Sequence, residues 1–272
     1  MEASGPYYLR LAHFLYENNV KVSVVNPLTI KRFSQMRLVR AKTDKKDAQV
    51  IAQYGQTEQP GAWKPNDEIS LKMLQINTLL ESIQKQITAF NNQLEAFTYS
   101  GIIDAQVNSS LKSLIKGLNQ QQEKLELRLE RLVNEHYQES YLRLTSIPGI
   151  GSKGAIMLIA ITDNFRKFDN YKQLIAYVGF SPRIYQSGTS VKGKGHICKM
   201  GKAQIRRVLY MCSWSAKRYN KACVEMYDRL KAKGKPERVI KIAIANKLLK
   251  QAFAIANGKS HYQENYMPKP CF

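Results

Sequence analysis

Two aspartates in the stretch "KTDKKDAQVIA", Asp44 and Asp47, have a spacing that suggests chemistry. At the start of a helix, residues three apart lie on one face, so both carboxylates would point the same way. Taken alone, such a pair most often caps a helix and offsets its dipole. Glu2 stands at the end of an expected strand, where α/β sheets gather catalytic groups. The three carboxylates could hold Mg²⁺ for phosphoryl transfer, in a basic neighbourhood made by Arg37, Arg40, Lys42, Lys45 and Lys46.

Ser187 lies in "YQSGTSVKGKGHICKMGKAQIRR", just before a dense run of positive charge. From Pro182 to Arg218 there are nine Lys or Arg residues and no Asp or Glu. A serine there could attack a phosphodiester, because cations stabilise both the alkoxide and the transition state. By itself, such a serine is more often a turn residue, and Tyr185 and His196 are an alternative nucleophile and a candidate base. The cations of this loop expected to contact DNA are Lys192, Lys194, Lys199, Lys202, Arg206 and Arg207.

The stretch "SIPGIGSKGA" has the form of a helix-hairpin-helix. Gly149 and Gly151 would let a backbone approach closely, and the free N–H groups of the next helix could hold one phosphate. Lys153 adds a positive charge, while Pro148 and Ile150 shape the turn. The alternative is a tight interhelical turn that binds nothing. In so basic a chain we favour a contact to DNA phosphate that does not read sequence.

The formal net charge of +21 over 272 residues points to a polyanionic partner. Nucleic acid is the natural one, and an anionic membrane surface is a weaker alternative. No apolar run approaches a membrane span and no signal-peptide pattern is present, so a cytoplasmic protein with no membrane partner is expected. The four cysteines form no CxxC pair, which favours reduced thiols over a zinc site.

The elements that carry these motifs divide the chain into three expected domains and a tail. Residues 1–60 suggest a partial α/β domain, with a helix after Pro6 and a buried strand at Lys21–Val25. A helix that leads into a strand normally crosses over from an earlier parallel strand, yet only Met1 and Glu2 precede the loop. We therefore expect a sheet that is incomplete at its N-terminal side.

Residues 61–138 carry two heptad seams and predict a long coiled-coil helical hairpin without catalytic chemistry. Residues 139–260 predict a mainly helical domain that contains the helix-hairpin-helix and the basic loop, and 261–272 an extended tail. The expected fold class is thus α/β followed by all-α. The seams are Met73, Ile76, Leu80, Ile83, Ile87, Phe90, Leu94 and Phe97, then Leu111, Ile115, Leu118, Gln122, Leu125, Leu129 and Leu132.

The motifs and their order resemble the DEDD-type transposases of insertion sequences, which include RNA-guided bridge recombinases and are related to pilin-gene invertases. The stretches "EASGPYY", "VNP" and "KTDKKDA" are similar to that family's first domain, and "IPGIG", "GFSP" and "QSG" to its last. The resemblance covers essentially the whole chain. It implies an RNase-H-like, resolvase-like domain, a coiled coil and a C-terminal transposase domain.

Position by position, the resemblance assigns Glu2, Asp44 and Asp47 to three members of the family's acidic tetrad, which implies a Mg²⁺ site. It assigns Ser187 to the serine that forms a covalent link to DNA. It also implies homo-oligomers, dimers or tetramers, that act on DNA with a structured non-coding guide RNA. The resemblance thus favours the catalytic interpretation of residues that, by themselves, suggest a cap and a turn.

One departure from the family pattern concerns the tetrad's first aspartate, which belongs to a strand well before the glutamate and has no counterpart in this sequence. We therefore expect little strand transfer from this chain by itself. Two alternatives stay open beside the recombinase. One is a catalytically inactive remnant that binds DNA or RNA. The other is a metal-dependent junction nuclease in which Ser187 is idle.

Overall fold

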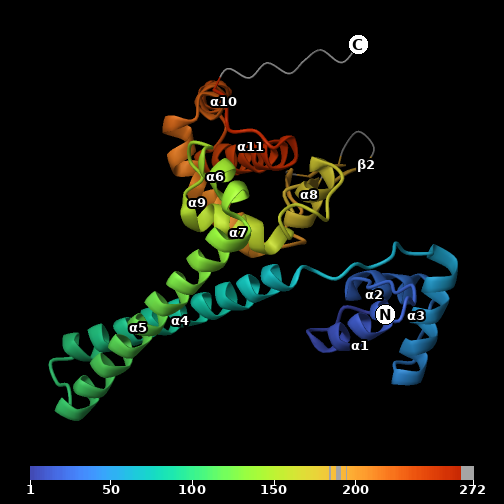
Figure 1. Cartoon of the computed structure of the whole chain (residues 1–272), viewed down its shortest axis with the longest axis horizontal. Coiled ribbons are helices and arrows are strands. Elements are labelled where there is room, and N and C mark those ends of the chain that lie inside the picture. Colours follow the sequence, from blue (N-terminus) through green and yellow to red (C-terminus); the bar gives the residue numbers. More distant parts are fainter. Residues whose placement is uncertain (184, 188–190, 194, 265–272) are drawn as a thin grey trace. The chain divides into compact units, whose positions relative to one another are not determined.

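A computed structural model describes residues 1–183, 185–187, 191–193 and 195–264, with only the backbone described at 187, 191 and 192 (Figure 1). By packing, the chain divides into two units, Met1–Asn66 and Asp67–Phe272, each with its own core. The sequence suggests separate domains before and after residue 138, whereas the structure places both parts in the second unit. The reason is a shared core, since Met73, Leu132 and Ile156 belong to one buried cluster.

The first unit contains three helices: α1 (Tyr7–Glu17), α2 (Pro27–Met36) and α3 (Asp44–Glu58). The Asn26 side chain caps α2 by accepting a hydrogen bond from the Leu28 N–H. Pro27, at the first helical position, has no N–H and therefore needs no acceptor. The core of the unit is small. Its buried residues are Ile30, Phe33 and Val50.

The predicted strand at Lys21–Val25 forms a single parallel bridge, between Glu2 and Val25. The Val25 N–H donates to the Met1 carbonyl and the Ala3 N–H donates to the Val25 carbonyl, each over 2.9 Å. No longer ladder forms in residues 1–66, all of which are described, because the chain turns into α1 directly after this pairing. The expected α/β sheet is therefore represented by one bridge, and the RNase-H-like fold stays a prediction.

The second unit begins with a helical hairpin made by α4 (Glu68–Tyr99) and α5 (Ala105–His136). Each helix has 32 residues and is therefore about 48 Å long. The predicted seams face the partner helix: Ile83 and Ile87 of α4, and Leu111 and Leu129 of α5, are buried. Most seam residues toward the tip are only half-buried, because two helices cannot enclose a seam alone.

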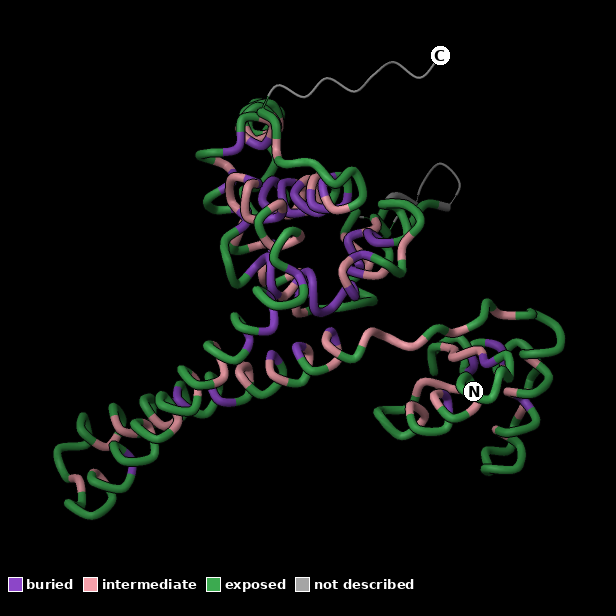
Figure 2. The backbone as a smooth tube through the Cα atoms, viewed as in Figure 1, coloured by how far each residue is buried: buried purple, intermediate pink, exposed green. Residues whose placement is uncertain are grey.

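The remaining helices of the unit form a compact helical body around α7 and α11, as the distribution of buried residues in Figure 2 shows. Helix α7 is apolar on nearly all sides and is buried along most of its length. No helix in the described part of the chain is long and apolar enough to cross a membrane. The helices are α6 (Gln138–Thr145), α7 (Ser152–Thr162), α8 (Tyr171–Val178), α9 (Ala203–Tyr219), α10 (Lys221–Ala232) and α11 (Glu237–Gly258).

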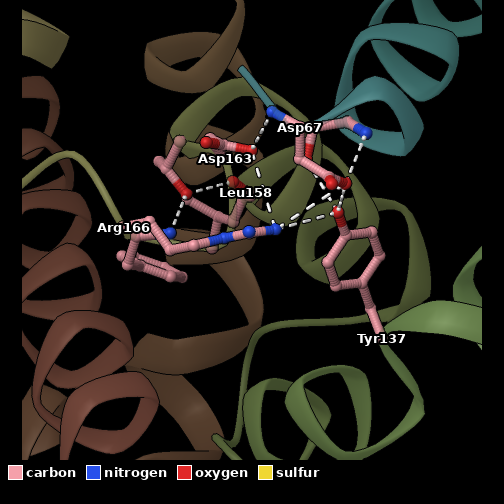
Figure 3. A network of polar contacts seen from close by, with 8 residues as sticks. Asp67, Tyr137, Leu158, Asp163 and Arg166 are labelled. Atoms are coloured by element: carbon pink, nitrogen blue, oxygen red, sulfur yellow. Dashed lines mark hydrogen bonds and ion pairs between the residues drawn. The ribbon is translucent and has the colours of Figure 1, made fainter. Parts of the chain in front are cut away.

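A polar network fixes the hairpin to this body (Figure 3). The Tyr137 hydroxyl donates a short hydrogen bond to the Asp67 carboxylate and lies 3.0 Å from the Ser70 hydroxyl. The Asp67 N–H donates to Asp163, and Arg166 lies between the two carboxylates, 3.7 Å from one and 3.9 Å from the other. Burial alone would raise the pKa of Asp67, but the hydrogen bonds from Tyr137 and the Ser70 backbone, together with Arg166, lower it.

Candidate functional site

In the first unit, Thr43 rather than an aspartate caps α3, with its hydroxyl accepting from the Lys46 N–H over 3.3 Å. Neither Asp44 nor Asp47 is therefore used as the cap that the isolated motif suggests. Both lie in the first turn, where their charge offsets the helix dipole. No hydrogen bond or ion pair joins either side chain, or that of Glu2, to another residue of the described structure.

Glu2 and Asp47 line one pocket of about 540 Å³ between the N-terminal segment, α2 and α3. Cations from both sides of the pocket, Lys31, Arg40 and Lys42, line it as well. Asp44, one turn earlier on α3, is exposed and does not contribute to this lining. The structure thus brings together two of the three carboxylates in the expected basic surroundings.

The two carboxylates fit Mg²⁺ in part. Among the described residues, no group of three His, Cys, Asp or Glu side chains is close enough to hold a metal ion. Mg²⁺, however, often keeps several waters and takes only one or two carboxylates, with substrate phosphates completing its shell. The oxygen donors of Glu2 and Asp47 suit that arrangement, whereas a three-carboxylate cage does not form in the described structure.

In the second unit, the basic loop forms a β-hairpin between α8 and α9. β1 (Pro182–Arg183) pairs with β4 (His196–Ile197), and β2 (Gln186–Ser187) pairs with β3 (Val191–Lys192), both antiparallel. Ser187 is opposite Val191 in the backbone pairing, while its side chain, like that of Lys192, lies outside the described part, as does all of Lys194.

The base of this hairpin is fixed against the C-terminal end of α8. The Lys199 N–H donates to the Gly179 carbonyl over 3.1 Å, and the Lys202 N–H donates to the Tyr177 carbonyl over 3.1 Å. Gly201, with φ of +136°, leaves no room for a Cβ against the Tyr177 carbonyl. The hairpin that carries Ser187 is therefore anchored to the end of α8 by backbone hydrogen bonds.

In the turn between α6 and α7, Gly149 makes the close approach that a glycine permits, whereas Gly151 has an extended backbone that any residue adopts. Gly149 has φ of +105° and packs directly on Ala216 of α9, where a Cβ would lie 2.6 Å from the alanine Cβ. The Asn220 amide donates to the Pro148 carbonyl over 3.3 Å, and Ile150 is buried. Gly151 is the N-cap of α7 and, having no side chain, supplies no side-chain cap to the first N–H groups of that helix.

A groove of about 830 Å³ runs between this turn and α9. It is lined by residues 147–154 of the turn and by Arg207, Met211 and Ser215 of α9. The structure thereby brings the predicted phosphate site beside the first part of α9. The assignment of this turn as a helix-hairpin-helix remains a prediction.

Several predicted DNA contacts already have partners within the protein. Lys153 pairs with Glu126 of α5 over 3.0 Å, and Arg207 pairs with Glu81 of α4 over 2.9 Å. The hydrogen bond from Lys153 lowers the pKa of Glu126 and so keeps that carboxylate charged. The hairpin, expected to contain no chemistry, thus supplies an acidic partner to each of two cations that line the groove, and no signal in the heptad pattern distinguishes these acids.

The other cations differ in their roles. Arg206 donates to the Val178 carbonyl over 2.6 Å and so helps to hold the end of α8. The Lys202 ammonium lies 5.8 Å from the Tyr177 ring centre, and Lys199 is exposed. Of the predicted cations on this surface, Arg206 is the one with the clearest structural role.

Comparison with known proteins gives matches at both ends of the chain. Residues 141–228 match the sequence model described as "Transposase IS116/IS110/IS902 family", and residues 1–98 match a DEDD transposase model of the IS110 type. The "Pilin gene-inverting protein" of Moraxella lacunata is 31% identical over 259 residues, covering 94% of this chain and 78% of that protein. The protein of the same name from Moraxella bovis has the same identity and coverage. An insertion element IS110 protein of Streptomyces coelicolor is 27% identical over 180 residues, covering 66% of this chain and 43% of that protein.

Proposed function

The chain belongs to the IS110 family of transposases, and from that premise we propose that it cleaves and rejoins DNA through Ser187 and a Mg²⁺ held at Glu2 and Asp47. The observation that supports the proposed Mg²⁺ site is the pocket lined by Glu2 and Asp47. It joins two carboxylates distant in sequence, which have no partner among the described residues, with cations suited to a phosphodiester. Asp44, outside the pocket lining, would act by its charge one turn away.

In the proposed reaction the Ser187 hydroxyl loses its proton and its oxygen attacks a DNA phosphorus. One bond from serine oxygen to phosphorus forms, one bond from phosphorus to a sugar oxygen breaks, and the departing sugar oxygen takes up a proton. The hydroxyl of a second strand then reverses these changes, so the phosphodiester is restored without an external energy source. Mg²⁺, when bound, would supply positive charge to the phosphate oxygens.

DNA is the substrate, and the turn at Pro148–Gly151 with Lys153 is proposed to hold its backbone. The net charge of +21 supports a polyanionic partner. A structured non-coding RNA is proposed to set the target by base pairing, and two or four copies of the chain are proposed to act together. These last features come from the family resemblance.

The experiment is a trapping assay with the whole chain, its element's terminal DNA and the adjoining transcript, in the presence of Mg²⁺. A DNA strand linked to protein is expected on a denaturing gel, and Ser187→Ala should abolish it. Ser181→Ala, at the base of the same hairpin, is the matched control and should keep it. An adduct that persists in Ser187→Ala would show that the nucleophile is another residue.

The alternatives give different outcomes in the same assay. Cleavage that survives Ser187→Ala but requires Asp47 would identify a junction nuclease. Salt-sensitive binding that is unchanged by Ser187→Ala and Asp47→Asn, with no cleavage, would identify a binding-only protein.

A further inference from the structure

Helix α9 presents a stripe of side chains to solvent that combines cations with large apolar groups. Arg207, Met211, Trp214 and Arg218 are spaced four, three and four residues apart, which places them on one helix face. Met211 is 66% exposed and Trp214 is 47% exposed. The helix from Ala203 to Tyr219 contains no acidic residue.

The Trp214 indole is held from one side by a buried cation. The Lys241 ammonium, from α11, lies 3.3 Å from the ring centre, and the whole residue is only 5% exposed. A cation on the face of an indole is attracted by the ring quadrupole. The Lys217 ammonium, from α9 itself, lies 5.8 Å from the same ring centre. Lys241 therefore covers one face of the ring, while 47% of the residue Trp214 stays exposed.

A network of charged groups restricts the movement of this cation. The Glu237 carboxylate accepts from Lys241 over 3.3 Å and from Lys217 over 2.9 Å, and the Tyr227 hydroxyl donates to it over 2.8 Å. Lys217 also lies 4.9 Å from the Tyr227 ring centre. Fixing the partner of the indole orders the indole itself, so a ligand that stacks there meets a preorganised surface.

Cations on the same stripe could hold the phosphates beside a stacked base. Arg218 is one turn from Trp214, about 6 Å along the helix, and Arg207 is about 10 Å away on the other side. The Arg207 side chain is 61% exposed even though it pairs with Glu81, and a guanidinium has N–H donors to spare. Arg207 and Met211 also line the groove beside the α6–α7 turn, so the stripe continues that groove.

We propose that Trp214 is a stacking platform for an unpaired base of a DNA strand, with Arg207 and Arg218 binding the phosphates on either side. Stacking on an exposed aromatic side chain with flanking cations is the way in which proteins bind single strands without reading sequence. DNA is the strand because it is the substrate in the proposed function. The inference rests on the proposed DNA-binding function and adds that part of the bound DNA is unpaired.

The test uses the protein's own fluorescence. Trp63 and Trp214 are the two tryptophans of the chain, so Trp63→Phe leaves Trp214 as the one reporter. This variant is titrated with oligo(dT), with an abasic strand of equal length and with a blunt duplex, while the anisotropy of a label on each DNA reports binding separately. Oligo(dT) is expected to quench the Trp214 emission, and the abasic strand and the duplex are not.

Substitutions give a second measurement. Trp214→Leu should weaken oligo(dT) binding by about 5- to 100-fold and abasic binding by less than about 2-fold, while Trp214→Phe should keep most of the affinity. If oligo(dT) binds without quenching the Trp214 emission, or if the abasic strand quenches it equally, then Trp214 does not stack on a base. Either result would leave the proposed DNA binding intact. Quenching by oligo(U) but not by oligo(dT) would overturn the assignment to DNA in favour of RNA. No binding of any of these strands would overturn the proposed DNA binding as well.

Discussion

The pocket of the first unit and the groove of the second both carry residues suited to phosphate chemistry, but their charges are held differently. Glu2 and Asp47 have no internal side-chain partner in the described structure, whereas Lys153 and Arg207 each pair with an acid of the helical hairpin. The pocket is also supported by a core of few residues, while the groove backs on a large one. Unpaired charges are available to a ligand at once, whereas the acids beside Lys153 and Arg207 partly offset the positive charge of those side chains.

The largest effect is expected at the pocket. Asp47→Asn should lower Mg²⁺-dependent cleavage at least about 100-fold, because a lost metal ligand removes several kcal/mol of transition-state stabilisation. Asp44→Asn, the matched control one turn away and outside the pocket lining, should have a much smaller effect. Single-turnover cleavage rates at several Mg²⁺ concentrations measure the effect of each substitution. Equal losses of rate in Asp44→Asn and Asp47→Asn would contradict the different roles given to these two residues.

The backbone of the groove should be the next most sensitive feature. Gly149→Ala should destabilise the second unit by about 2 to 4 kcal/mol, because it forces a side chain at positive φ into Ala216. Gly151→Ala is the matched control in the same turn. Its Cβ would meet no atom of the described residues within 4 Å, and the substitution should cost less than about 1 kcal/mol. Urea unfolding followed by circular dichroism compares the two variants.

The attachment of the hairpin to the body depends on the Tyr137 hydroxyl. Tyr137→Phe should destabilise the second unit by about 1 to 3 kcal/mol, because the buried Ser70 hydroxyl and the Asp67 carboxylate lose a hydrogen-bond partner. Tyr99→Phe, near the hairpin tip and 84% exposed, should change stability little. Equal urea midpoints for wild type and Tyr137→Phe would show that the network contributes nothing.

The paired state of the groove cations predicts a smaller effect in the opposite direction. Glu126→Gln should free Lys153 and tighten DNA binding by about 2- to 5-fold, since an exposed ion pair is worth about 0 to 1 kcal/mol. The slope of log affinity against log salt should also steepen by up to about one. Glu123→Gln, an exposed change on the same helix, controls for the change in net charge. Identical DNA affinities of the Glu126→Gln and Glu123→Gln proteins would show that Glu126 does not compete with DNA for Lys153.

The smallest effect is expected for the contribution of Glu237 to stability at acid pH. Hydrogen bonds from Lys217 and Tyr227 lower the pKa of this carboxyl from 4.5 to about 2. A lowered pKa in the folded state adds stability above pH 4.5, and that stability is lost as the pH falls toward 2. The difference in urea midpoint between wild type and Glu237→Gln should therefore shrink from pH 6 to pH 2.5, and a constant difference would contradict the assignment.

Much of the second unit follows from local patterns. The heptad seams predict α4 and α5, and Gly149 predicts a close approach at the α6–α7 turn, because both signals depend on residues close in sequence. The strand at Lys21–Val25 was less predictable. A β-branched run shows a capacity for pairing, but a ladder requires a partner segment that sequence distance does not reveal.

The candidate site shows the same division. The sequence by itself indicated which residues are suited to phosphate chemistry, the helices that bear most of them, and a net charge that favours a polyanionic partner. Tertiary structure alone decided that Asp47 rather than Asp44 lines the pocket, that Glu126 neutralises Lys153, and that Lys241 covers one face of Trp214. The physical reason is that the two kinds of signal act over different distances. Periodicity and turns depend on neighbours along the chain, whereas electrostatic and stacking partners depend on distances through space, which only packing sets.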